Sequence, residues 1–105
     1  MDNYNIMEEA VKHYGRDNQI KKSIEEMGEL TTVLMRQAQG NDLDNQKVVT
    51  EIADVAIMSF QLALIYGLDK VKDEIDRKLE QLKDTIHPEV TAKINYIIKE
   101  YYYGG

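Results

Sequence analysis

The sequence predicts an all-α protein: an antiparallel four-helix-type bundle followed by an additional C-terminal helix over residues 88–103. Helix formers dominate the 105 residues, which include a single Pro. Apolar residues recur at helical spacing, and no segment shows the strict alternation that is typical of a half-buried strand. Since no repeat or inter-domain linker interrupts the chain, we expect one domain over residues 1–105.

Glycines set the limits of the first two expected helices. The first runs over about residues 3–14 and ends at Gly15, and the second continues to about residue 39, where Gly40 closes it. Asp17 or Asn18 is expected to cap the second helix. The side chains expected to face the core are Ile6, Ala10 and Val11 in the first helix and Ile20, Ile24, Met27, Leu30, Thr31 and Leu34 in the second.

The third helix is expected over residues 45–66, with Asp42 or Asp44 as its cap. From Ile52 onward it is apolar around nearly its whole circumference, which is typical of a helix buried on every side. We expect it to be the central element of the bundle or to carry a subunit interface as well. Its longest apolar run, residues 55–68, is too short to span a bilayer, so no membrane association is expected.

The last two helices are separated by a proline. Gly67 ends the third helix, and Asp69 is expected to cap a fourth that ends near Thr85. His87-Pro88 interrupts the chain because a residue before proline disfavours the helical region, and Pro88 suits the first position of a fifth helix. The apolar stripe of the fourth helix contains Val71, Ile75, Lys78, Leu79 and Leu82, and that of the fifth Val90, Ile94, Ile97 and Tyr101.

Composition excludes several classes of function. The net charge is −6 and basic residues are interleaved with acidic ones, which disfavours binding to duplex nucleic acid. The absence of Cys excludes disulfides and zinc–thiolate sites and suits a reducing cytoplasm, where we expect the protein to be located. Residues 1–10 are acidic and amphipathic, unlike a secretory signal. An acidic protein can still bind a small polyphosphate when a divalent metal supplies positive charge.

Two matched pairs of carboxylates are the most informative feature. Glu26 and Glu29 are spaced i, i+3, as are Glu51 and Asp54, so each pair projects from one face of its helix. The expected antiparallel hairpin brings the two pairs to similar levels. Four converging carboxylates would repel one another unless a cation neutralised them. Hard oxygen ligands of this kind suit Mg²⁺ or Mn²⁺, so the sequence predicts a metal site.

Each pair also has a structural interpretation. Glu26 and Glu29 lie on the flank away from the expected apolar stripe, so they could form a solvated face with i, i+4 ion pairs. Glu51 and Asp54 lie early in their helix and could favour its dipole. The two pairs together, at a spacing that stacks them, favour the metal site.

These residues and their neighbours resemble the signature of the MazG-like, all-α nucleoside triphosphate pyrophosphohydrolases. The two similar blocks are Ile24-Glu25-Glu26-Met27-Gly28-Glu29-Leu30 and Glu51-Ile52-Ala53-Asp54-Val55. The resemblance covers about residues 19–83. It implies that a nucleoside triphosphate substrate is hydrolysed to the monophosphate and pyrophosphate with Mg²⁺, or Mn²⁺ in its place. It also implies a homo-oligomer, either a dimer or a dimer of dimers.

The resemblance further implies roles for individual residues. Glu25 would either support the metal ligands without binding the metal itself, or orient the attacking water as a base. Lys22, one turn before the acids, and Lys78 in the fourth helix are candidates for binding the triphosphate. The metal ligands would be Glu26, Glu29, Glu51 and Asp54.

The fourth helix departs from the family pattern. Asp76 stands in the place of an Asn that contacts the nucleotide, although Lys78 fits the family's Lys. Positions 81–82, Gln and Leu, stand where an Arg is expected, and Lys83 is the nearest replacement. The phosphate clamp of the family is therefore incomplete in this helix.

Two other classes of function compete with the hydrolase. One is a non-catalytic helical oligomeric interaction protein that retains the acidic site. The other is a di-metal carboxylate oxidase, which needs two carboxylate-x-x-His elements, whereas Asp84 and His87 form a single one. The run Tyr101–Tyr103 could stack on a base, but an oligomer contact fits an amphipathic helix end better.

Overall fold

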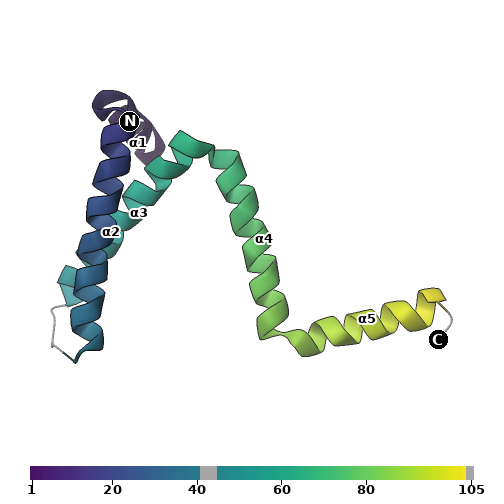
Figure 1. The fold of residues 1–105 in the computed structure, drawn as a ribbon. Coiled ribbons are helices and arrows are strands. Elements are labelled where there is room, and N and C mark those ends of the chain that lie inside the picture. Colours follow the sequence, from purple (N-terminus) through teal and green to yellow (C-terminus); the bar gives the residue numbers. More distant parts are fainter. Residues whose placement is uncertain (41–44, 104–105) are drawn as a thin grey trace. The chain divides into compact units, whose positions relative to one another are not determined.

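The structure, a computed structural model, describes residues 1–40 and 45–103, excluding the side chains at positions 90, 91, 102 and 103. Every regular element in this part of the chain is an α-helix, which confirms the all-α prediction (Figure 1). The expected helices are all present, with boundaries close to the predicted ones. They are α1 (Asn3–Tyr14), α2 (Arg16–Ala38), α3 (Asn45–Tyr66), α4 (Leu68–Ile86) and α5 (Pro88–Tyr103).

The chain divides into two units, residues 1–68 and 69–105. In the first unit α2 and α3 lie side by side and antiparallel, and α1 packs against both (Figure 1). The second unit contains α5 and nearly all of α4. The single domain over residues 1–105 stays a prediction.

A single glycine joins α1 to α2. Gly15 has a φ of 89°, which L side chains rarely adopt, and it ends α1 as predicted. Because α2 begins directly after it, Gly15 also occupies the N-cap position and the predicted cap by Asp17 or Asn18 is wrong. Asp17 lies in the first turn, where its charge suits the helix dipole. The Asn18 Nδ2 donates to the Tyr14 carbonyl at 2.8 Å instead.

Two more glycines end helices as predicted. Gly40, with a φ of 84°, follows α2, and Gly67, with a φ of 117°, separates α3 from α4. Since α4 begins one residue after Gly67, Asp69 lies in its first turn and the predicted cap by Asp69 is wrong. The predicted caps Asp42 and Asp44 lie outside the described residues.

The face of α2 that packs against α3 is more polar than predicted. Its buried residues are Gln19, Ser23, Glu26 and Val33. The expected core stripe is largely exposed, with exposed fractions of 65% for Ile24, 39% for Met27 and 46% for Leu34. The predicted orientation of α2 is therefore wrong. Hydrogen bonds make the polar face compatible with burial, since Gln19 Nε2 donates to Gln61 Oε1 at 2.6 Å and the Ser23 hydroxyl to the Gln19 carbonyl at 2.8 Å.

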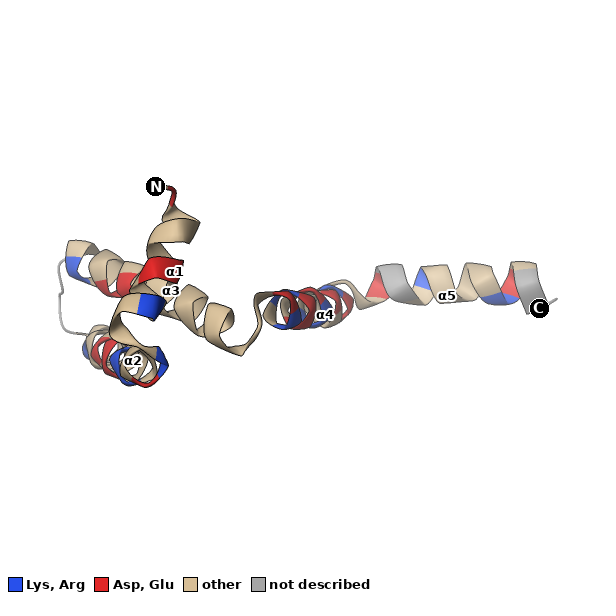
Figure 2. Ribbon diagram, turned by 90° about the horizontal axis from the view of Figure 1, so that it is seen from above, with Lys and Arg blue, Asp and Glu red and all other residues tan. Residues whose placement is uncertain are grey.

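Helix α3 presents its two faces to different surroundings. Glu51, Met58, Gln61 and Ala63 are its buried residues. On the other side Val49 and Ile52 are about half exposed. Burial of α3 on every side is therefore wrong for the unit of residues 1–68, and a subunit interface on α3 stays a prediction. Uncharged residues prevail in the C-terminal half of α3 (Figure 2).

By length and composition α3 could also cross a membrane, a condition that the core helix of a globular protein meets as well. Within the described residues no other helix meets it. The expectation that the protein does not enter a membrane stays a prediction.

Helix α4 is strongly amphipathic. Acidic and basic residues are interleaved along it (Figure 2), and several form ion pairs one turn apart. These pairs are Lys72–Asp76 at 3.8 Å, Lys83–Glu80 at 3.4 Å and Arg77–Glu74. About half of the surface of its apolar side chains is exposed, namely Ile75, Leu79, Leu82 and Ile86. In α5 the side chains of Ile94, Ile97 and Tyr101 are exposed too.

The buried amide pair provides a test of the α2–α3 packing. Replacing Gln61 by Leu leaves the Gln19 amide buried without its partner, so we expect Gln61→Leu to lower the free energy of unfolding by about 1–3 kcal/mol in urea denaturation. The double variant Gln19→Leu/Gln61→Leu removes both polar groups and should recover most of this loss. A Gln61→Leu protein as stable as the wild type would contradict the packing.

Candidate metal centre

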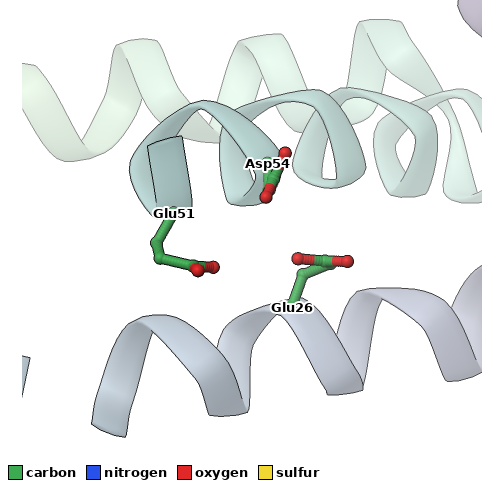
Figure 3. A group of neighbouring side chains, drawn as sticks. All are labelled: Glu26, Glu51 and Asp54. Carbon is green, nitrogen blue, oxygen red and sulfur yellow. The ribbon is translucent and has the colours of Figure 1, made fainter. Parts of the chain in front are cut away.

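Three carboxylates converge between α2 and α3. Glu26 projects from α2, and Glu51 and Asp54 project toward it from α3 (Figure 3). One oxygen atom of each residue lies within 4.8 Å of the other two. The antiparallel pairing of the helices brings these side chains together, as the sequence predicts.

The carboxylates of Glu26 and Glu51 are deeply buried. Their residues are 7% and 5% exposed, and Asp54 is half-buried. The Oε2 atoms of Glu26 and Glu51 have no hydrogen-bond partner among the described residues. A buried carboxylate oxygen without a partner is costly, because burial removes its hydration. A divalent cation would offset this cost, and the three hard oxygen donors suit Mg²⁺ or Mn²⁺.

A lysine accompanies each buried glutamate on the same helix. Lys22 Nζ lies 3.0 Å from Glu26 Oε1, and Lys47 Nζ lies 3.2 Å from Glu51 Oε1. Each lysine precedes its acid by four residues, which places the two side chains on one face. The hydrogen bond to Glu26 and the nearby acidic charges raise the pKa of Lys22. Each lysine thus contacts the Oε1 atom of its glutamate, while the Oε2 atom has no hydrogen-bond partner among the described residues.

Glu29, the fourth predicted ligand, lies beside the group of three. Its residue is exposed, and it is absent from the set of oxygens within 4.8 Å. The charge of Glu26 raises the pKa of Glu29, partial burial and the charge of Glu51 add to this effect, and Lys22 opposes it. The charges of Glu26 and Glu51 therefore influence Glu29, although it lies outside the group of three carboxylates. Its role as a metal ligand stays a prediction.

An open cavity of about 580 Å³ lies beside the carboxylates. It is bordered by Glu25, Gly28, Glu29, Thr32, Val33, Arg36, Lys47 and Glu51. A smaller cavity of about 130 Å³ touches Glu26 and Asp54 and also Lys22. A ligand in the larger cavity would contact both carboxylates and cationic side chains.

The other predicted site residues fall into two groups. Glu25 is exposed, lies 3.8 Å from Lys22 Nζ and borders the larger cavity, close to where its predicted role places it. Lys78 belongs to the second unit, where its Nζ is 3.9 Å from Glu74. Its contact with a nucleotide stays a prediction.

Two residues of the site were missed by the sequence analysis. Lys47 could have been found from its position four residues before Glu51, which repeats the spacing of Lys22 and Glu26. Arg36 lies seven residues after Glu29, two helical turns along the same face. This spacing is a weaker signal, because a basic residue near the end of a helix also suits its dipole.

No family model matches the chain, and no curated protein or solved structure is similar to it at the significance required. The MazG-like resemblance of the two acidic blocks therefore stays a prediction.

Repulsion within the cluster predicts a pH-dependent effect of Glu29. Because its pKa is raised in the folded protein, the ionised side chain destabilises the metal-free protein near neutral pH. We expect Glu29→Gln to raise the melting temperature at pH 7. The difference from the wild type should shrink as the pH falls through the raised pKa of Glu29 toward its ordinary value.

Thermal unfolding in the presence of a chelator, from pH 7 down to pH 4, would test this expectation. Glu25→Gln is the matched control, since Glu25 lies on the same helix and pairs with Lys22, and it should bring no such gain. A lower melting temperature of Glu29→Gln at pH 7 would contradict the repulsion.

Proposed function

We propose that the protein is a Mg²⁺-dependent nucleoside triphosphate pyrophosphohydrolase, which converts a (deoxy)nucleoside triphosphate to the monophosphate and pyrophosphate. The main support is the pair of buried carboxylate oxygens of Glu26 and Glu51, which have no hydrogen-bond partner among the described residues and lie close to Asp54. The similarity of the two acidic blocks to the MazG-like signature gives the reaction class.

Glu26, Glu51 and Asp54 would hold the metal, with Glu29 beside them. When bound, the metal neutralises phosphate charge and makes the α-phosphorus more electrophilic. The larger cavity is where the triphosphate would lie, since it is bordered by Glu29 and Glu51 and by two cationic side chains.

Glu25 would act on the attacking water. Its exposed carboxylate borders the same cavity as Glu51 and can accept a proton as a general base. The water oxygen attacks the α-phosphorus, the bond from this phosphorus to the bridging oxygen breaks, and pyrophosphate leaves with the electron pair. The proton of the water passes to Glu25.

A four-helix-type bundle and a homo-oligomer belong to the same proposal. Support comes from the exposed apolar side chains of both hairpin helices, among them Ile24 of α2 and Ile52 of α3. Covering these faces would remove apolar surface from water. The same surfaces support the alternative function, a non-catalytic oligomeric interaction protein that retains the acidic site.

Metal binding can be tested by thermal stability. We expect Mg²⁺ or Mn²⁺ to stabilise the protein in a concentration-dependent way, by about 2.7 kcal/mol at a concentration 100 times Kd. Glu51→Gln or Asp54→Asn should abolish the stabilisation. If neither Mg²⁺ nor Mn²⁺ stabilises the protein, the metal site is refuted.

Catalysis can be tested by release of pyrophosphate from a panel of canonical and damaged NTPs and dNTPs. At least one should be hydrolysed with pyrophosphate, and not phosphate, as the product. Glu25→Gln should keep the stabilisation by Mg²⁺ and lose roughly 10²–10⁴-fold in turnover if Glu25 is the base. Normal metal binding without activity on any member of the panel would favour the interaction protein.

A further inference from the structure

The larger cavity beside the carboxylates is bordered by two cationic side chains. Arg36 of α2 and Lys47 of α3 both border this cavity, together with Glu29 and Glu51. Both cations lie nearer to the connection between the two helices than the acids do: Arg36 follows Glu29 along α2, and Lys47 precedes Glu51 along α3. Arg36 is therefore separated from the acids, since it lies about two helical turns beyond Glu29 along α2.

The two cations differ in what they already contact. Lys47 Nζ is 3.2 Å from Glu51 Oε1, so its charge is used by the buried carboxylate. Arg36 is exposed and has no ion pair among the described residues. A guanidinium offers donors in a fork that matches phosphate oxygens bidentately. Of the two cations that border this cavity, Arg36 is thus the one whose charge no described residue pairs with.

The combination of charges restricts the ligand. A purely anionic molecule would be repelled by Glu29 and Glu51, and a bare cation would leave Arg36 unused. A phosphate chain that carries a divalent metal meets both requirements, with the metal at the carboxylates and the free phosphate oxygens at the arginine. A volume of about 580 Å³ is ample for a pyrophosphate group.

We propose that Arg36 binds the pyrophosphate portion of the metal-bound substrate in this cavity. This proposal rests on the proposed function and adds to it a residue that contacts the substrate. The alternative is a purely structural role for Arg36. It lies near the C-terminus of α2, where its positive charge interacts favourably with the helix dipole. The structural role would affect stability and leave affinity for pyrophosphate unchanged.

The test measures binding of inorganic pyrophosphate to the full chain by calorimetry, at fixed ionic strength and saturating Mg²⁺. We expect Arg36→Gln to weaken this binding at least about 10-fold, as for the loss of a hydrogen bond to a charged group. Its stabilisation by Mg²⁺ should equal that of the wild type. Arg36→Lys should restore part of the affinity. Lys21→Gln is the matched control, an exposed charge on the same helix outside this cavity, and should bind as the wild type does.

Three results would overturn the role of Arg36. One is wild-type affinity of Arg36→Gln for pyrophosphate. Another is an equal loss in Lys21→Gln, which would indicate a general effect of charge. Stabilisation of the wild type by Mg²⁺ without any binding of pyrophosphate would also overturn it while leaving the metal site intact. If Mg²⁺ fails to stabilise the protein, the proposed function fails first, and this inference falls with it.

Discussion

The burial of two carboxylates between α2 and α3 is the constraint on which the rest of the first unit depends. Glu26 and Glu51 can leave water only if their charge is offset. Lys22 and Lys47 offset it in part, through contacts at 3.0 and 3.2 Å. Each lysine reaches the Oε1 atom, and the Oε2 atoms have no hydrogen-bond partner among the described residues. The hairpin is therefore organised around a charge and much less around an apolar core.

This constraint accounts for the orientation of α2. A helix with one polar and one apolar face normally buries the apolar one, but here the polar face holds the site and the hydrogen-bonded amides of Gln19 and Gln61. Apolar side chains of α2 such as Ile24 and Leu34 are exposed instead. This arrangement is unfavourable at the surface, because apolar side chains there stay in contact with water.

Helix positions were predictable because local signals define them. Gly15, Gly40 and Gly67 supply the backbone conformations at which helices end, and Pro88 begins the last one. The i, i+3 spacing of the acids was also sufficient to place three of them together. Side-chain burial was not predictable in the same way, because periodicity shows that a helix has two faces without showing which neighbour each face meets.

The helix caps and the cationic residues of the candidate site were also not predictable from the sequence, because their roles depend on neighbouring elements. The connection of one residue between α1 and α2 moves Asp17 from the cap into the first turn, a difference that depends on chain geometry. Arg36 and Lys47 become part of the site because an antiparallel neighbour brings their helix ends together. Their residue types carry little information without that neighbour.

Each lysine lies on the same helix as the glutamate that it contacts, and this has a consequence for the folding of the hairpin. Neutralisation of Glu26 by Lys22, and of Glu51 by Lys47, is a contact within one helical turn and does not need the other helix. Each lysine therefore lowers the negative charge of its half of the candidate site while the helices are still apart, although Asp54 adds a further charge on α3. When α2 and α3 meet during folding, each buried glutamate already has its lysine beside it, so the two helices repel each other less than two bare anions would.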